Sequence, residues 1–151
     1  MASSTRFVAD AYASVDIATG VAVATPHQLT LILFDAALKH IGRASEHMKA
    51  GRIAEKGAAM TMAVRIVNEG LLGTLDLSQG ELALNLQLLY EYIGRCLLKA
   101  NLRNDATLLA EANALLTGMR DAWVAIAPSA LRGQPPLRPQ SGFLNLGNAA
   151  A

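Results

Sequence analysis

The sequence predicts an all-α protein: an antiparallel up-down four-helix bundle with an N-terminal docking arm and a flexible C-terminal tail. Apolar residues recur at intervals of three and four over four long segments, which is the period of a helix that buries one face. Capping residues and short turns separate these segments, so neighbouring helices should run antiparallel. No stretch alternates long enough to form a strand. We divide the 151-residue chain into an arm (1–24), a bundle (25–127) and a tail (128–151).

The first helix is predicted to begin at Thr25. Thr25 is a good N-cap, Pro26 suits the first helical position, and Gln28 completes a capping box. Gly51 ends the helix. Its core stripe consists of Leu29, Leu33, Ala37, Ile41, Ala44 and Met48.

The second helix is predicted to run from about Ile53 to Leu75. Gly70 and Gly73 weaken its C-terminal part, because glycine is a poor helix former. Its core stripe consists of Met60, Val64, Val67, Leu71 and Leu75.

Caps also mark the third and fourth helices. Ser78 and Glu81 have the spacing of a capping box before the third helix, which is predicted to fade near Ala100. Asn104 and Asp105 are suited to cap the fourth helix, which ends before Pro128. The core stripes are Leu82, Leu86, Leu89, Ile93 and Leu97 in the third helix, and Leu108, Ala112, Leu115, Met119, Ala122 and Ile126 in the fourth.

The two flanking segments differ in composition. The arm carries the apolar residues Phe7, Val8, Tyr12 and Val15. It is too short for an independent helix, so we expect it to dock on the bundle. The tail contains four prolines with glycine, serine and glutamine, a composition that predicts flexibility.

Composition excludes several classes of function. Charged residues make up only 17% of the chain and the formal net charge is +1, so nothing draws the whole protein toward nucleic acid or anionic lipid. The longest uncharged run, residues 17–34, contains Gly20 and Pro26, and we expect no membrane insertion. The N-terminus lacks the pattern of a signal peptide, and Cys96 is the single cysteine, so we expect a reducing compartment.

The sequence offers no constellation for catalysis or metal binding. A di-iron bundle needs Glu-x-x-His pairs, and none is present. His40 and His47 are interpreted as part of a solvated face, and Cys96 as a buried structural residue. We therefore expect no metal, no cofactor and no enzymatic activity; a helical enzyme or metal carrier remains the alternative that metal analysis would test.

Apolar residues beyond the core stripes indicate a binding surface. Candidate residues are Leu31, Phe34 and Leu38 in the first helix, and Leu84, Leu88 and Tyr92 in the third. Each helix of a bundle touches two neighbours, so a broad apolar face also arises without any partner. Because all four helices and the arm carry such a surplus, we interpret it as a surface for a protein partner.

A basic line follows on the third helix, formed by Arg95, Lys99 and Arg103. Glu91 lies four residues before Arg95, at the distance for an intrahelical pair. A solvated face is the simplest interpretation, and docking to an acidic surface is the alternative. Nucleic acid is disfavoured, because three charges without an aromatic platform are a weak footprint.

Three stretches together resemble the bacterial flagellin export chaperones, the FliS family. ATPHQLTLILFDAALKHI resembles the start of that family's bundle, where S/T-P-x-x-L precedes L-Y/F-D-G/A-A. QGELALNLQLLYEYIGRCLLKANLRND resembles its third helix, and LLAEANALLTGMRDAW its last helix. Tyr12 matches the tyrosine of the family's arm. The resemblance covers about residues 7–128; Gln79 stands where the family has one of two paired glycines, and the tail is not part of the shared pattern.

The resemblance implies a non-enzymatic chaperone of the bacterial cytosol. Such a protein binds the disordered C-terminal segment of flagellin, prevents premature polymerisation and keeps flagellin competent for type III flagellar export. A component of the membrane export gate then receives the complex, and the arm around Tyr12 covers part of the client groove. A structural or adaptor bundle that binds a folded partner is the alternative. The client-free protein is a candidate homodimer through its apolar surface.

Overall fold

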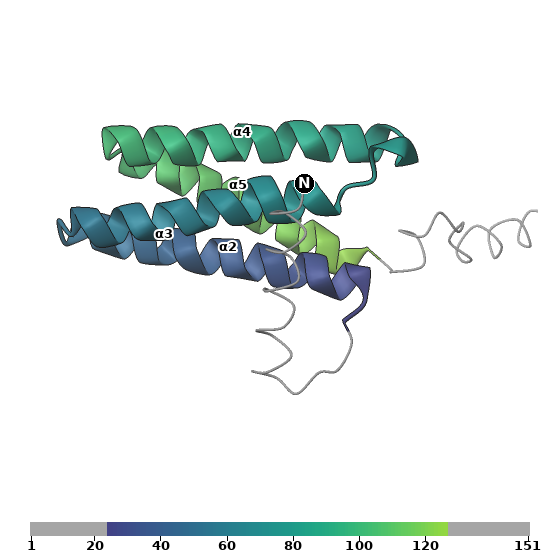
Figure 1. Ribbon diagram of the computed structural model, residues 1–151, viewed down its shortest axis with the longest axis horizontal. Coiled ribbons are helices and arrows are strands. Elements are labelled where there is room, and N and C mark those ends of the chain that lie inside the picture. The colour runs from purple at the N-terminus through teal and green to yellow at the C-terminus, as the bar shows by residue number, and fades with distance from the viewer. Residues whose placement is uncertain (1–23, 127–151) are drawn as a thin grey trace, which may run out of the picture.

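The computed structural model describes residues 24–126, and these form a bundle of four long helices. The α-helices are α2 (Pro26–Lys49), α3 (Ile53–Arg65), α4 (Glu81–Arg103) and α5 (Ala106–Ala125). Each packs against its neighbours in the chain, and α5 closes back on α2. Figure 1 shows the helices lying along one long axis, with the α2–α3 and α4–α5 turns at the same end. The predicted all-α bundle is confirmed, whereas the predicted arm and tail lie outside the described residues.

The start of α2 follows the sequence prediction. The Thr25 side chain accepts a hydrogen bond from the Gln28 amide at 3.1 Å, and the Thr25 amide donates to the Gln28 side chain at 2.9 Å. Both halves of a capping box are therefore present. The helix ends at Lys49, and Gly51 adopts a φ of 73°, a conformation that favours glycine.

The second predicted helix changes its geometry part-way. After α3 the chain continues as the π-helical segment η1 (Ile66–Leu71) and the 3₁₀ turn η2 (Leu72–Thr74). The π-helical segment buries two neighbouring residues, Ile66 and Val67, together with Gly70 and Leu71. A wider turn changes which residues face inward, so the regular stripe predicted for residues 53–75 holds only in part.

The predicted capping box before α4 is wrong. Ser78 belongs instead to the 3₁₀ turn η3 (Leu77–Gln79), where its amide and hydroxyl both donate to the Asp76 carboxylate. The residue that precedes α4 is Gly80, with a φ of 98° and no side-chain cap. Asp76 lies two residues from Ser78, one residue nearer than Glu81, and its carboxylate accepts both bonds, so Ser78 caps no helix.

A two-residue junction links α4 and α5. Asn104 ends α4 in the left-handed conformation, with a φ of 52°. Asp105 caps α5 by accepting from the amides of Thr107 and Leu108 at 2.9 and 3.1 Å, as predicted. The third helix thus extends three residues beyond the predicted Ala100.

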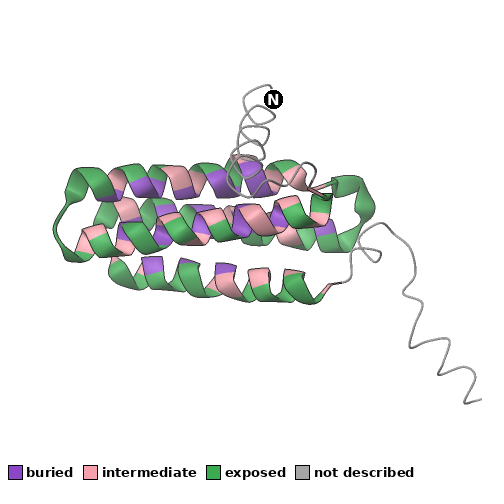
Figure 2. Ribbon diagram, turned by 90° about the horizontal axis from the view of Figure 1, so that it is seen from below, coloured by how far each residue is buried: buried purple, intermediate pink, exposed green. Residues whose placement is uncertain are grey.

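The core lies along the axis between the four helices. Figure 2 shows buried residues facing inward on each of them. Leu33, Met60, Leu97 and Leu116 are fully buried representatives of α2 to α5. Two predicted core residues of α4, Leu82 and Leu89, are exposed, and Tyr90 is buried in their place. The buried face of the N-terminal half of α4 therefore differs from the core stripe that the sequence predicted.

Two side-chain contacts fix the ends of the bundle. At one end the His27 and Trp123 rings stack with centroids 5.4 Å apart, and the Trp123 indole donates to the His27 carbonyl at 3.1 Å. At the other end Lys56, which is 4% exposed, donates to the Asn101 carbonyl and to the Asn104 side chain at 3.0 and 3.1 Å. The first contact joins α2 to α5, and the second joins α3 to the C-terminal end of α4.

Candidate functional site

Two of the three candidate residues on α2, Phe34 and Leu38, lie in or against the core. Phe34 is only 1% exposed, and its ring contacts Tyr90 and Trp123. Leu31 is half-buried, and Leu38 is half-buried against the core. The expectation of a partner surface at Phe34 is therefore corrected, because α2 needs a broad apolar face to contact both α3 and α5.

The candidate residues on α4 lie on the surface. Leu84, Leu88 and Tyr92 are 46, 63 and 39% exposed, and they follow one another at four-residue spacing. The Tyr92 hydroxyl donates to the Glu111 carboxylate on α5 at 2.7 Å, which fixes the ring at the edge of the row. This hydrogen bond to a carboxylate also raises the pKa of Tyr92.

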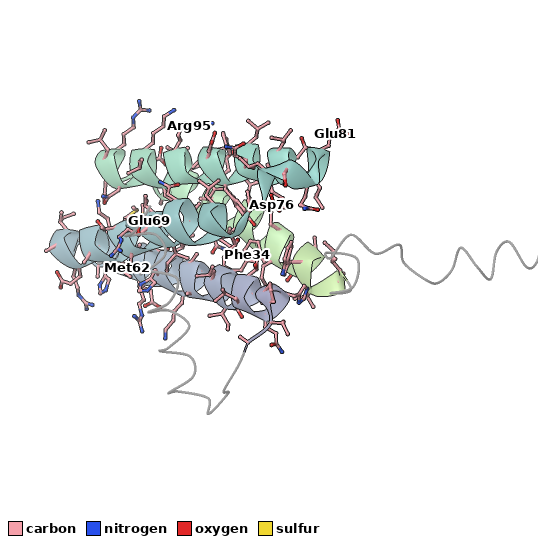
Figure 3. The ribbon with its side chains drawn as sticks, turned by 45° about the vertical axis from the view of Figure 1, so that its right-hand side comes forward. Phe34, Met62, Glu69, Asp76, Glu81 and Arg95 are labelled. Atoms are coloured by element: carbon pink, nitrogen blue, oxygen red, sulfur yellow. The ribbon has the colours of Figure 1, made fainter. Side chains whose placement is uncertain are left out.

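The exposed apolar row extends beyond the residues that sequence reasoning selected. Leu98 and Leu102 lie further along the same side of α4 and are 53 and 85% exposed. Figure 3 shows Glu81 and Arg95 on the edge of α4 that faces away from the other helices. The four-residue spacing of Leu98 and Leu102 was the available signal for this extension.

A second group of exposed apolar residues lies near the start of α4. It comprises Leu77, Leu82 and Leu89. Leu82 and Leu89 share a side of the helix that is turned by about a third of a turn from the Leu84–Leu88 row, as their spacing dictates. The apolar surface of α4 is consequently broadest at its N-terminal half.

The basic line of α4 is exposed as well. Arg95, Lys99 and Arg103 all lie on the surface. The ion pairs of the described residues lie elsewhere: Arg65 with Glu69, and Arg120 with Asp35 and Asp121. Glu91 and Arg95 form no ion pair with each other, despite their four-residue spacing.

His40, His47 and Cys96 are partly or fully buried in the bundle. His40 and His47 are half-buried instead of solvated, and burial lowers the pKa of His40, with Arg43 and Lys39 adding to the effect. Cys96 is buried, as predicted. Within residues 24–126 no group of three or more His, Cys, Asp or Glu side chains could hold a metal ion.

No helix among the described residues is long and apolar enough to cross a membrane. The predicted arm residues Phe7, Val8, Tyr12 and Val15 lie outside the described residues. Most of the exposed large apolar side chains of the described bundle lie on α4, next to its basic residues.

Comparison with known proteins places this bundle in a family. The family model described as "Flagellar protein FliS" matches residues 8–130. The chain belongs to the FliS family. The match includes all of the described residues, most of the predicted arm and the first three residues of the predicted tail.

Curated members of the FliS family cover most of the chain. The flagellar secretion chaperone FliS of Salmonella typhimurium is 43% identical over 121 residues, which is 80% of this chain and 90% of that protein. The Escherichia coli protein of the same name is 40% identical over 114 residues, 75% of this chain and 84% of that protein. The Bacillus subtilis relative is 36% identical over 100 residues, 66% of this chain and 74% of that protein. Membership in the FliS family supports a role as a flagellar export chaperone rather than an enzyme.

Proposed function

We propose that this protein binds the disordered C-terminal segment of flagellin in the bacterial cytoplasm, prevents its premature polymerisation and keeps it competent for type III export. The observation that carries the proposal is the exposed row of Leu84, Leu88 and Tyr92 on α4. A disordered client gains helix only if it buries enough apolar surface to offset its ordering, and this row offers that surface.

The proposed mode of binding is an amphipathic helix of the client lying along α4. Leucines at four-residue spacing give such a helix a continuous apolar track. The client's apolar residues, which would otherwise drive polymerisation, are then shielded. After loading, a component of the membrane export gate receives the complex.

The experiment is calorimetric titration of the full chain with a flagellin C-terminal peptide, comparing the unmodified protein with Leu88→Ala. Loss of a buried leucine contact of about 1.5–3 kcal/mol lowers affinity by roughly ten- to a hundred-fold. Val124→Ala is the matched control, since Val124 is 50% exposed on α5. Equal affinity of both variants, with unchanged melting temperatures, would contradict a client site on α4.

Circular dichroism separates the proposed client from a folded partner. Coupled folding of the peptide adds helix beyond the sum of the two separate spectra. A folded partner bound by an adaptor bundle would add none. Circular dichroism of the protein mixed with the peptide therefore tests both the class of partner and the mode of binding.

A further inference from the structure

The first turns of α4 carry an apolar patch that the described helices leave largely uncovered. It consists of Leu77, Leu82 and Leu89, which are 46, 57 and 40% exposed, and we call it the start patch. Leu89 lies three residues before Tyr92, whose hydroxyl donates to Glu111 of α5. The start patch therefore lies toward the side of α4 that faces α5.

The start patch is open because the last turns of α5 lie against α2 instead. The Trp123 ring stacks on His27, and Arg120 pairs with Asp35 at 2.8 Å. Figure 1 shows the end of α5 beside the start of α2 and apart from the start of α4. The leucines of the start patch thus have the spacing of core residues without a described helix that covers them.

The same end of the bundle is acidic. Asp76, Glu81 and Asp121 are exposed there. Within residues 24–126, Asp76 and Glu81 form no ion pair. Arg120, the only basic residue of α5, already pairs with Asp35 and Asp121. The start patch is therefore flanked by negative charge that the described helices leave unpaired.

The tail of the chain begins at this end and carries the opposite charge. It follows Ile126, the residue after α5. Residues 127–151 include Arg132 and Arg138 and no acidic residue. Further along is a short apolar group: Phe143, Leu144 and Leu146. A segment with this order of residues can bring its arginines to the acidic end and its apolar group to the start patch.

The tail is long enough for this contact. Phe143 follows Ile126 by 17 residues, and a flexible chain of that length spans about 20–25 Å on average. Leu89 lies about 12 Å along α4 from Glu81, at 1.5 Å per residue, and packed helices lie about 8–10 Å apart. Because the tail is joined to the bundle, its apolar group has an effective concentration on the order of millimolar at the start patch.

The arm is a poorer occupant of the start patch than the tail. It precedes α2, whose main neighbours in the bundle are α3 and α5 rather than α4. Its charged residues are Arg6, Asp10 and Asp16, one base and two acids, so its side chains carry a net charge of −1. The acidic residues beside the patch repel such a segment. Charge and point of attachment thus both favour the tail.

We propose that residues 143–146 dock in cis on the start patch, with Arg132 and Arg138 against the acidic end of the bundle. The tail then provides the cover that α5 does not. Leu84 and Leu88 of the proposed client row face a side of α4 about a third of a turn away, so they stay accessible. The inference goes beyond the proposed function, and its tests need no flagellin.

Disulfide formation in the full chain tests the contact. Asn85 is exposed on α4 between Leu82 and Leu89, and Asn145 lies within the apolar group, so neither substitution removes an apolar contact. We expect the Asn85→Cys, Asn145→Cys protein to form an intramolecular disulfide roughly ten-fold or more faster than the Val124→Cys, Asn145→Cys protein. Val124 is the matched control, because it is 50% exposed and closer to Asn145 along the chain.

Peptide mapping of the product identifies the joined cysteines, so buried Cys96 stays in place. Equal rates in the two proteins would overturn the proposal, because a tail that does not dock reaches Val124 at least as readily. A disulfide between two chains would overturn docking in cis. Faster cross-linking of Asn85→Cys to Ser14→Cys in the arm would make the arm the occupant and would also overturn it.

Charge reversal tests the two arginines of the tail. We expect Arg132→Glu with Arg138→Glu to slow the same cross-link by roughly three-fold or more, because like charges then meet at the acidic end. Lys39→Glu with Arg43→Glu, at exposed positions of α2, changes the net charge equally and should leave the rate unaltered. An unchanged rate in the tail variant, or an equal loss in the control, would overturn the proposed placement of the tail.

Truncation tests the cover without any added cysteine. We expect removal of residues 140–151 to raise the fluorescence of an apolar dye by roughly two-fold or more, because the start patch is exposed. The same truncation in a Leu82→Gln, Leu89→Gln protein should give no rise, since the patch is then polar. Thermal denaturation confirms that each protein is folded. Equal dye fluorescence of the full and the truncated chain would overturn the proposal.

Discussion

Phe34 contacts aromatic rings from two other helices, Tyr90 at 6.1 Å and Trp123 at 6.4 Å between ring centroids. Replacing it with alanine leaves a cavity between α2, α4 and α5. We expect Phe34→Ala to lower the free energy of unfolding by about 3–5 kcal/mol, measured by urea denaturation. Val124→Ala, on an exposed part of α5, should change stability by less than about 0.5 kcal/mol. A Phe34 variant as stable as this control would contradict the burial of Phe34 in the core.

Lys56 is a buried cation at the end of the bundle where the α2–α3 and α4–α5 turns lie. Its ammonium group donates to the Asn101 carbonyl, which belongs to the last turn of α4, where the carbonyls lack partners within the helix. We expect Lys56→Met to cost about 1.5–3 kcal/mol of stability, because the hydrogen bonds come from a charged group. Thermal denaturation against Lys39→Met, an exposed position on α2, checks this; equal melting temperatures would show that solvent replaces the ammonium group without loss.

Single residues also show what sequence reasoning resolves. Thr25 and Asp105 were predicted as caps, because the chemistry of a cap lies within three residues of the chain. Leu84 and Phe34 were both assigned to a partner surface, yet one is exposed and the other is buried. Their difference depends on which neighbouring helix covers each side of α2 and α4, and a single helical pattern does not contain that information.

At the scale of elements, the π-helical segment η1 lies against α4 at Gly94. A Cβ atom at Gly94 would lie 2.6 Å from the Asn68 Oδ1 atom, so alanine forces the amide to move. Glycine inside a helix otherwise costs up to about 1 kcal/mol relative to alanine. We expect Gly94→Ala to stabilise the protein by about 0.5–1 kcal/mol in an Asn68→Ala background, and by less in the unmodified chain.

A double-mutant cycle in urea measures this coupling. Gly118→Ala in α5 is the matched control, because nothing lies within 4 Å of the added atom. It should give the full gain by itself. Equal effects of Gly94→Ala in both backgrounds would mean that the Asn68 side chain does not restrict α4.

The elements themselves were largely predictable, and their irregular parts were not. The 3.6-residue period and the caps placed four helices within a few residues of their ends. The period of η1 differs from that of an α-helix, and nothing in the apolar pattern of residues 66–71 distinguishes the two. Gly80 explains the missed start of α4: it supplies a positive φ and frees Asp76 to form a separate turn.

At the scale of the whole molecule, we expect the predicted arm to compete with the proposed client for apolar surface. The arm's own residues, Phe7, Val8, Tyr12 and Val15, cannot form a stable helix alone. If they rest on the surface that binds the client, only protein molecules with that surface open can bind. The apparent affinity for the client then falls in proportion to the open fraction. We expect deletion of residues 1–20 to increase aggregation and to leave flagellin peptide affinity equal or stronger.

Calorimetry of the full-length and the shortened chain against one peptide decides between two roles of the arm. A loss of affinity of about ten-fold or more would show that the arm forms part of the client site. Light scattering in the same samples reports the apolar surface that the deletion exposes.

Trp123 is the only tryptophan of the chain, and it sits where the last helix meets the first. Its partner His27 is 96 residues away, so this stacking arises only when α5 has returned to α2. Helix formation alone leaves the indole in water, whereas closure of the bundle surrounds it. The chain therefore contains a fluorescent probe of bundle closure, and we expect its emission to lag behind the circular dichroism signal during refolding.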